Sequence, residues 1–446
     1  MGRSFYTLMA AQFFSSLADN AVYIAAITLL AQDKAPAWHA AALIPMFAFF
    51  YVLLAPYVGA LADSLPKGRV MFVANIIKII GCLMMLFGTH PILAYAIVGL
   101  GAAAYSPAKY GILTEMLPTS KLVTANGWIE GLTIGSIILG VVLGGQLVGR
   151  SVSHLLLSFD LPLLDTGIDT PPEAAICILV VIYLLAAWFN NRIPLTGAQM
   201  RPLPRNLFVL LPDFWTCNLA LWRDKLGQIS LATTTLFWGV SGNLRYIVLA
   251  WSAAALGYST REASTLVGVV AIGTAVGAVL ASLKMRLEHA PRLMPLGIAM
   301  GLLMIVLNLI TNVWLAAPFL ILLGAIGGFL VVPMNALLQH RGHNLMGAGR
   351  SIAVQNFNEQ ACILGLGALY TLVATVNWSG FSITQKLGLS ALKPEQLSAY
   401  LAITMFGLLV AGMMLVIKRW HASNLVRHPQ ELARLLHIAR NDNLHG

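Results

Sequence analysis

Long runs of apolar residues, separated by short polar breaks, repeat along the whole chain. A helix needs about 20 apolar residues to cross the roughly 30 Å of hydrocarbon in a bilayer, and most of these runs have that length. Because every backbone polar group must find a partner inside lipid, the runs are expected as helices and not as strands. The pattern predicts about twelve membrane-spanning helices. We place them at 6–31, 41–62, 70–88, 91–113, 124–149, 174–192, 228–256, 262–284, 293–312, 314–338, 346–376 and 396–418.

Charged residues are rare in this chain, and their distribution indicates how it lies in the membrane. Only 10% of its 446 residues are charged and 58% are hydrophobic, whereas about 25% of a soluble domain is charged. If both termini lie in the cytoplasm, most Lys and Arg residues fall on the cytoplasmic side, as the positive-inside rule requires. The net charge of +10 is then a topology signal of a polytopic membrane protein, and we expect no nucleic-acid partner. The four cysteines have no metal-binding or disulfide spacing.

Three polar landmarks occur twice along the chain, at nearly the same offset. Asn20 matches Asn243, Pro107 matches Pro333, and the stretch 126–130 matches 355–359. The offset is about 223 to 229 residues, and an even number of spans separates the copies, so the copies share their membrane orientation. A parallel repeat of this kind is typical of the two six-helix halves of major facilitator transporters. The sequence therefore predicts an all-α polytopic membrane protein with the major facilitator fold.

Changes in composition divide the chain into four parts. They are an N-terminal six-helix bundle at 1–192, a cytoplasmic linker at 193–227, a C-terminal six-helix bundle at 228–418 and a basic cytoplasmic tail at 419–446. Within the linker, Asp213–Lys225 is either an amphipathic helix at the membrane interface or a solvated segment. Within the tail, Pro429–Arg440 places leucines on one helical face, which suits a helix on anionic lipid. A solvated tail and a partner-docking segment are the alternatives for this stretch.

The break after the second predicted span carries a dense group of charges. It reads GALADSLPKGR (Gly59 to Arg69) and resembles the signature loop between spans two and three of major facilitator transporters. We expect Asp63 to pair with Lys67 or Arg69 in a charge relay that holds the cytoplasmic side together. These three side chains are therefore candidate gating residues that need not touch a substrate.

Six ionisable residues inside predicted spans are candidates for a function, because a charge costs about 2.5 to 3.5 kcal/mol at the bilayer centre. They are Asp19, Lys78, Lys109, Glu130, Arg245 and Glu359. Charged groups persist there only where they face protein or water, so the pattern predicts a polar cavity between the two halves. Each also has a structural interpretation. Asp19 would pair with Arg245 or Lys78, Lys78 and Lys109 would pack or extend to the interface, and the glutamates would make salt bridges at helix ends.

The functional interpretation assigns these charges to one ligand. Lys109 and Arg245 suit an anionic group such as a phosphate, and arginine adds a bidentate fork. Pro107 frees a backbone carbonyl near Lys109, which gives the ammonium a polar neighbour. Asp19 with Asn20 suits a small cation or a substrate amine, so a cavity that holds both charges would accept a zwitterion. The further candidates for substrate binding or ion coupling are Tyr105, Tyr110, Asn243, Gln355, Asn356, Glu130 and Glu359.

Several strings of the sequence point to one family. They are LADNA, GAAAYSPAKYGIL, VTANGWIE, TLFWG with NLRY, GGFLVVPMNALLQ and GAGRSIAVQN. Together they resemble the bacterial lysophospholipid transporter (LplT) family, a branch of the major facilitator superfamily, over about residues 8 to 370. The string AAAYSPAKYGIL is specific to this resemblance and is not expected in a generic drug exporter.

The resemblance implies a substrate, a direction and a partner. Members of the family move lysophosphatidylethanolamine and related lysophospholipids from the outer to the inner leaflet of the bacterial inner membrane. An acyltransferase, acyl carrier protein synthetase, then restores the second acyl chain, and transport has been linked to sodium. The family's acidic and amide pair falls on Asp19 and Asn20, its lysine on Lys109 and its seventh-span arginine on Arg245. Such transporters usually act as monomers and use no cofactor beyond the possible sodium ion.

The chain departs from the family pattern in a longer acidic outer loop at 150–173, a longer outer loop around 377–395 and the basic tail. Two rival functions exist. One is a proton-coupled major facilitator exporter of small amphiphilic molecules that uses Asp19. The other is a membrane-embedded acyltransferase or lipid hydrolase, which is disfavoured because the sequence has no GxSxG motif and its histidines lie mostly in loops or the tail. We therefore expect a transporter and not an enzyme.

Overall fold

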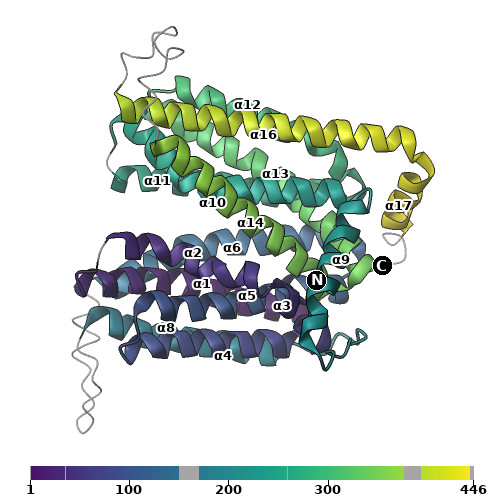
Figure 1. Ribbon diagram of the computed structural model, residues 1–446, viewed down its shortest axis with the longest axis horizontal. Helices are drawn as coiled ribbons and strands as arrows, with labels where there is room; N and C mark the ends of the chain where they lie inside the picture. Colours follow the sequence, from purple (N-terminus) through teal and green to yellow (C-terminus); the bar gives the residue numbers. More distant parts are fainter. Residues whose placement is uncertain (1, 36, 150–169, 259, 376–392, 442–446) are drawn as a thin grey trace. The chain divides into compact units, whose positions relative to one another are not determined.

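The computed structural model describes the whole chain except residues 1, 36, 150–169, 259, 376–392 and 442–446 (Figure 1). The described residues form helices and connecting segments, with no strand among them. Contacts divide the chain into two compact units. Unit 1 comprises Met1–Leu117, Leu132–Leu219 and Gly342–Phe357, and unit 2 comprises Pro118–Gly131, Ala220–Arg341 and Asn358–Gly446. Most of the two extended outer loops predicted from the sequence lies outside the described residues.

Unit 1 is built from the helices of the first half of the chain. They are α1 (Arg3–Gln32), α2 (Ala37–Leu53), α3 (Ala55–Ser64), α4 (Lys67–Leu86), α5 (Pro91–Met116), most of α6 (Thr119–Leu147), α8 (Pro171–Asn191), η1 (Leu207–Val209) and most of α9 (Leu210–Arg223). α1 packs against α8, α4 packs against α5 and α8, and α2 packs against α5. Small and branched side chains such as Ala18, Val98 and Leu179 fill the fully buried core between them, which allows the helices to approach closely.

Unit 2 is built mainly from the second half of the chain. Its helices are α10 (Gly227–Leu256), α11 (Thr260–Lys284), η2 (Leu287–Leu293), α12 (Met294–Val306), η3 (Leu307–Leu309), most of α13 (Val313–Met346), most of α14 (Ala348–Thr375), α16 (Pro394–Arg427) and α17 (Pro429–Asn441). α16 packs along both α12 and α10, and α10 also packs against α11. Trp251 of α10 is fully buried and donates its indole N–H to the carbonyl of Leu307 at 3.1 Å, so even this large side chain leaves no polar group unsatisfied.

The predicted spans all fall on these helices. In the described part of the chain, nine helical segments are each long and apolar enough to cross a membrane, and α2 with α3 forms a tenth that is bent by 62°. Pro56 stands in the first turn of α3 and has no N–H to donate to the end of α2, which explains the break. α10 and α14, which carry the polar residues of the seventh and eleventh predicted spans, are not among these segments.

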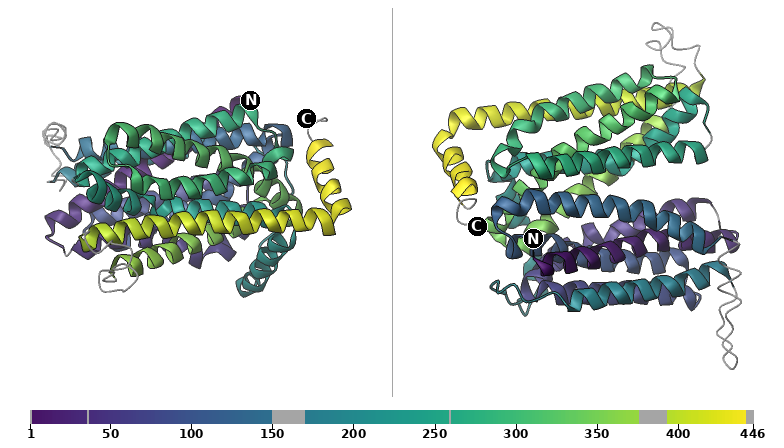
Figure 2. Two further views of the ribbon diagram at one scale, coloured as in Figure 1. Left: turned by 90° about the horizontal axis from the view of Figure 1, so that it is seen from above. Right: turned by 180° about the vertical axis from the view of Figure 1, so that it is seen from behind.

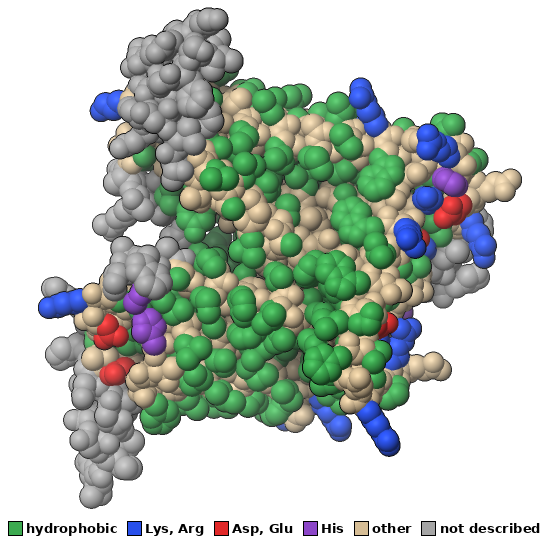
Figure 3. Space-filling view, in the orientation of Figure 1, with side chains coloured by type: hydrophobic (Ala, Val, Ile, Leu, Met, Phe, Trp, Pro, Cys, Tyr) green, Lys and Arg blue, Asp and Glu red, His purple; other side chains and the backbone are tan. Residues whose placement is uncertain are grey.

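The surface of the helices has the character expected for contact with lipid. Figure 3 shows hydrophobic side chains over much of the visible helical surface, while Lys and Arg side chains gather near the end of α16 and on α17. Large apolar side chains are exposed in the middle of the spans, for example Val181 at 63% and Leu302 at 52%. Such exposure would be unfavourable in water but is satisfied by hydrocarbon.

The two copies of the repeat have the same local structure. Asn20 in α1 donates its amide N–H to the carbonyl of Ser16, and Asn243 in α10 donates to the carbonyl of Gly239, both at 2.8 Å. A proline lies inside α5 and inside α13 at the matching position. These prolines are Pro107 and Pro333. The matched asparagines make the same hydrogen bond and the matched prolines lie inside their helices, which supports a parallel repeat.

The division between the units passes through α9, α13 and the two helices that carry the third landmark, α6 and α14. The first turns of α6 pack in unit 2, where Thr124 donates to the carbonyl of Ser282 at 3.1 Å. The first turns of α14 pack in unit 1, where a Cβ atom added to Gly349 would lie 2.6 Å from the carbonyl oxygen of Gly59. Glycine is needed at such a close backbone approach because any side chain would separate the helices.

The tail forms a helix that is partly covered by its own unit. Figure 2 shows α17 turning away from the end of α16. α17 contacts η2, and Leu432 is only 1% exposed, whereas Leu435 and Leu436 are half-buried and Arg434 is exposed. The leucine face thus packs at least partly on protein, and binding of the tail to anionic lipid stays a prediction.

Candidate functional site

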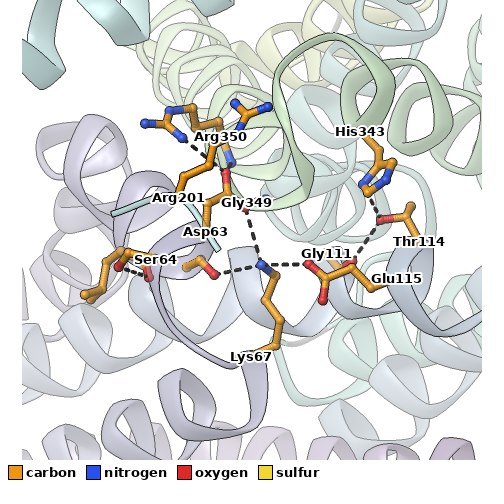
Figure 4. Close-up of polar contacts among 12 residues, drawn as sticks. Asp63, Ser64, Lys67, Gly111, Thr114, Glu115, Arg201, His343, Gly349 and Arg350 are labelled. Atoms are coloured by element: carbon orange, nitrogen blue, oxygen red, sulfur yellow. Dashed lines mark hydrogen bonds and ion pairs between the residues drawn. The ribbon is translucent and has the colours of Figure 1, made fainter. Parts of the chain in front are cut away.

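An aspartate near the end of α3 holds the beginning of α14 within unit 1 (Figure 4). Asp63 is 7% exposed, and its carboxylate accepts hydrogen bonds from the backbone N–H groups of Gly349 at 2.6 Å and Arg350 at 3.0 Å. These N–H groups belong to the first turn of α14, where no intrahelical acceptor is available and the helix dipole is positive. Asp63 therefore caps a helix to which it is not adjacent in sequence.

Lys67 lies between two carboxylates at the same place. Its Nζ lies 3.3 Å from Asp63 Oδ1 and 2.9 Å from Glu115 Oε1, and it donates to the carbonyl of Ala62 at 2.7 Å. Arg69, the other predicted partner of Asp63, is exposed. The structure thus pairs Asp63 with Lys67 and adds Glu115, which sequence reasoning missed because it stands at the end of an apolar span.

The linker supplies further contacts to this cluster. The backbone N–H of Arg201 donates to the carbonyl of Asp63 at 2.9 Å, and its guanidinium donates to the carbonyl of Met346 at 2.7 Å. Arg350 Nε lies 3.0 Å from Asp213 Oδ2, at the beginning of α9. The linker therefore helps to hold the first turn of α14, a role that its composition did not indicate.

A cavity of about 350 Å³ lies beside the cluster in unit 1. Asp63, Lys67, Glu115, Arg201 and His343 contribute to its walls. The walls carry the two carboxylates of Asp63 and Glu115 and the two cations of Lys67 and Arg201, and Lys67 contacts both carboxylates. Charges of opposite sign therefore pair within the walls of this cavity.

A second polar network is buried inside unit 1 and is centred on Asp19. Asp19 Oδ2 lies 2.8 Å from Lys78 Nζ, and Asp19 Oδ1 accepts a hydrogen bond from the Tyr183 hydroxyl at 2.6 Å. Lys78 also donates to Ser15 Oγ at 2.9 Å, and Ser15 donates in turn to Asn75 Oδ1 at 2.7 Å. Of the two partners predicted for Asp19, the structure places Lys78 in contact with it.

Tyr105 links this network to the YSPAKYGIL segment of α5. Its ring centroid lies 4.9 Å from Lys78 Nζ, a distance at which an aromatic face attracts a cation. Its hydroxyl donates to Asn190 Oδ1 at 3.4 Å. Lys109 is 9% exposed, and its Nζ lies 4.1 Å from the ring centroid of Tyr110. The predicted substrate-binding residues of α1 and α5 therefore lie in one unit, with Lys78 joining α1 to Tyr105.

The first turns of α14 add amides to the same unit. Asn356 donates to Ser106 Oγ at 2.9 Å, and the neighbouring Gln355 is buried. Asn20, next to Asp19, donates to the carbonyl of Ser16. The structure thus brings Asn356 to the segment that holds Lys109, whereas Asn20 satisfies its own helix.

The other predicted site residues lie in unit 2. Glu130 is 2% exposed and its Oε1 accepts from Asn335 Nδ2 at 3.4 Å. Asn243 donates both to its own helix and to the carbonyl of Ile363 at 3.0 Å. Glu359 is buried. Arg245 lies in α10, but its side chain is outside the described residues. The structure therefore assigns the predicted phosphate ligands Lys109 and Arg245 to different units.

Unit 2 also contains a buried ion pair that sequence reasoning missed. Arg341 makes two hydrogen bonds to Asp224, at 3.1 and 2.6 Å, and both side chains are less than 9% exposed. Asp224 also accepts from the backbone N–H of Gly227 at 2.7 Å, at the beginning of α10. The aspartate thus caps α10 much as Asp63 caps α14.

The described residues do not form a ready site for a metal ion. No group of three or more His, Cys, Asp or Glu side chains with the spacing of metal ligands occurs in this part of the chain. The predicted sodium ligand Asp19 has both carboxylate oxygens engaged, one by Lys78 and one by Tyr183. The carboxylate of Asp19 is therefore paired with an ammonium group in this structure, and sodium binding at Asp19 stays a prediction.

Comparisons with known proteins agree with this architecture. The family model of the Major Facilitator Superfamily matches residues 8–366. The chain is 40% identical over 379 residues to the lysophospholipid transporter LplT of Yersinia pestis (strain Pestoides F), covering 84% of this chain and 87% of that protein. The same values hold for LplT of Yersinia pseudotuberculosis serotype O:3 (strain YPIII).

Solved structures show the fold at much lower identity. The human organic anion transporter MFSD10 superposes with a TM-score of 0.67 at 14% identity, covering 94% of this chain and 100% of that chain. A bacterial homologue of the iron transporter ferroportin, in an outward-facing state, gives 0.67 at 13% identity with the same coverage. The predicted major facilitator fold is confirmed. The chain belongs to the Major Facilitator Superfamily, in the family of the LplT transporters.

Proposed function

We propose that this protein is a secondary transporter of lysophospholipids such as lysophosphatidylethanolamine. The observation that carries the proposal is the 40% identity to LplT transporters over 84% of the chain. At that identity the family is shared, and the buried charges of α1 and α5 offer the chemistry that a zwitterionic headgroup needs. We further propose that the substrate moves from the outer to the inner leaflet of a bacterial inner membrane, with both termini in the cytoplasm.

A single-chain lipid needs two kinds of surface along its path. Its headgroup is costly to place in hydrocarbon without polar partners, whereas its tail gains from leaving water. Lys109 and Arg245 are the proposed phosphate ligands. Further proposed substrate-binding residues are Tyr105, Tyr110, Asn20, Asn243, Gln355 and Asn356. Asp19 is the proposed acceptor for the ethanolamine amine or a coupling sodium ion, with Glu130 and Glu359 as further ion-coupling candidates. The tail would stay against the apolar faces of neighbouring spans.

The charge cluster around Asp63 supports transport by alternating access. α3 belongs to the first predicted six-helix half and α14 to the second, so rocking of the halves would have to separate Asp63 from Gly349 and Arg350. The bonds there are short and charge-assisted, which makes them strong enough to hold one state. Asp63, Lys67 and Arg69 are therefore proposed as gating residues, with Asp63 and Lys67 in direct contact.

The proposal also places the protein before an acylation reaction. A lysophospholipid delivered to the cytoplasmic leaflet lacks one acyl chain, so an enzyme there must add it. We propose a functional partnership with an acyltransferase, acyl carrier protein synthetase, and a monomeric transporter.

The test is uptake of labelled lysophosphatidylethanolamine into proteoliposomes, with and without a sodium gradient. We expect the wild type to transport, and Lys109→Ala and Arg245→Ala to lose at least about 90% of the rate, a tenfold loss worth about 1.4 kcal/mol. Lys121→Ala is the matched control, because the Lys121 side chain is exposed. We expect this variant to transport at the wild-type rate.

Two results would overturn the proposal. If the wild type moves no lysophospholipid but exports small amphiphiles in response to a proton gradient, the protein is a proton-coupled exporter. If both Lys109→Ala and Arg245→Ala transport at the wild-type rate, the headgroup does not bind where we propose.

A further inference from the structure

Lys78 is a buried cation to which the proposed transport cycle gives no role. Its side chain is 1% exposed, although it stands inside an apolar span of α4. A lysine placed there solely to extend to the membrane surface would have an exposed ammonium group. Its Nζ instead points to named acceptors, Asp19 Oδ2 at 2.8 Å and Ser15 Oγ at 2.9 Å.

The surroundings of Lys78 stabilise a positive charge at this point. The ring centroids of Tyr105 and Tyr183 lie 4.9 and 5.6 Å from Nζ, within the range of cation–π attraction. Asn75 is fully buried and accepts from the Ser15 hydroxyl, which orients the Ser15 oxygen toward the ammonium. The pocket is thus complete for a cation, with a carboxylate, a hydroxyl and two aromatic rings.

Asp19 has a different exposure from its partner. Its side chain is 19% exposed while that of Lys78 is 1% exposed, so the carboxylate is the more accessible of the two groups. Tyr183 occupies the second oxygen. A sodium ion or an organic amine that reaches Asp19 therefore meets a carboxylate whose charge is already neutralised from the buried side. Two cations on one carboxylate repel each other strongly in a medium of low dielectric constant.

We propose that Lys78 is the resident counter-cation of Asp19 and controls which external cations bind there. An external cation binds Asp19 tightly only after the ammonium of Lys78 withdraws, so Lys78 lowers the affinity of this carboxylate for sodium and for substrate amines. Lys78 is thus a specificity-determining residue and not only a packing charge. The inference deepens the proposed function, because it concerns the carboxylate that we assign to the amine or the coupling ion.

The test is sodium binding to the purified protein, which requires neither lipid substrate nor transport. Thermal unfolding is followed while sodium chloride replaces choline chloride at constant ionic strength. We compare the wild type, Lys78→Gln, Lys78→Arg and the double variant Asp19→Asn with Lys78→Gln. Glutamine can still contact Ser15 but leaves Asp19 without a cation, whereas arginine keeps the positive charge.

We expect sodium to stabilise Lys78→Gln at a concentration at least about tenfold lower than any effect on the wild type, equivalent to about 1.4 kcal/mol in binding. Lys78→Arg should respond like the wild type, and the double variant should show no specific response. The inference is wrong if wild type and Lys78→Gln respond to sodium alike, or if the response of Lys78→Gln persists in the double variant.

A comparison of the wild type with the double variant tests the inference even if Lys78→Gln cannot be purified. The inference requires that sodium does not stabilise the wild type through Asp19, so the wild type and the double variant should respond alike. A millimolar response that only the wild type shows would overturn the inference. Because no lysophospholipid is used, neither result depends on whether the protein transports it.

Discussion

Asp63 accepts a hydrogen bond of 2.6 Å from the backbone N–H of Gly349, a residue 286 positions further along the chain. The same carboxylate accepts from Arg350 and lies next to the ammonium of Lys67. The side chain of Asp63 thus caps α14 and forms an ion pair. The backbone carbonyl of Asp63 accepts a hydrogen bond from the linker. This concentration of contacts makes Asp63 the residue on which the packing of the first turn of α14 most depends.

Asp63→Asn should weaken this region without preventing insertion of the spans. The amide oxygen can still accept one N–H of α14, but the charge that holds Lys67 and Arg350 is lost. Hydrogen bonds to charged groups contribute about 1.5 to 3 kcal/mol each, so we expect the free energy of unfolding to fall by at least about 1.5 kcal/mol. Thermal unfolding in detergent measures the change.

Asp33→Asn is the matched control for that substitution, because Asp33 is an exposed aspartate at the end of α1. An exposed substitution of this kind should change stability by no more than about 0.5 kcal/mol. If Asp63→Asn unfolds at the same temperature as the control, the capping contacts are not important for stability.

Gly349→Ala should separate α14 from α3. An added Cβ atom would lie 2.6 Å from the carbonyl oxygen of Gly59 and 2.7 Å from Asp63 Oδ1, distances that force the helices apart. Overpacking of this kind costs about 1 to 3 kcal/mol, and we expect both lower stability and altered transport. The matched variant is Gly365→Ala in the same helix, where no atom lies within 4 Å of the added Cβ.

Gly365→Ala should be neutral or stabilising by up to about 1 kcal/mol, because alanine favours the helix more than glycine does. Thermal unfolding of both variants gives the comparison directly. Equal behaviour of the two would mean that the approach of α14 to α3 is not as close in the membrane.

Most of the fold was predictable because it follows from local patterns. The length of apolar runs defines the spans, and the matched Asn20 and Asn243 reveal the repeat, which the structure reproduces as the same contact in each unit. The bend between α2 and α3 was not predicted, since Pro56 lies inside a continuous apolar run and its effect depends on the local helix geometry. The helix α9 lies within the predicted linker, and its amphipathic pattern had suggested it.

The candidate site was predictable residue by residue but not contact by contact. Buried charges such as Asp19 and Lys78 are conspicuous in an apolar span, yet the sequence left Arg245 and Lys78 as equal partners for Asp19. The side chains of Glu115, Arg341 and Asp224 were missed for a different reason. They stand near helix ends, where a charge is ordinarily solvated, and only the tertiary packing buries them.

Arg341→Met should be the most destabilising single change at the Asp224 pair. It leaves a carboxylate that is only 8% exposed without its cation, and breaking a buried pair in this way costs about 3 to 5 kcal/mol. Adding Asp224→Asn should recover part of the loss, since asparagine can still accept from the N–H of Gly227. Thermal unfolding of the two variants tests this, and a double variant that is less stable than Arg341→Met would contradict the ion-pair explanation.

Cys217 in α9 should react slowly with maleimides at neutral pH. Its side chain is 9% exposed, and burial, together with the nearby Asp213 carboxylate, raises the pKa of the Cys217 thiol. The thiolate is the reactive form, so a raised pKa lowers its fraction at pH 7 to 8 and moves the rise in labelling rate to higher pH.

The experiment uses a variant in which the other three cysteines are alanine. The control places a cysteine at Leu219, which is 50% exposed, in a chain lacking Cys217. Its labelling rate should level off near the ordinary thiol pKa of about 8.5, while that of Cys217 should still rise above it. Identical pH profiles for the two positions would show that Cys217 is not buried in α9 as described.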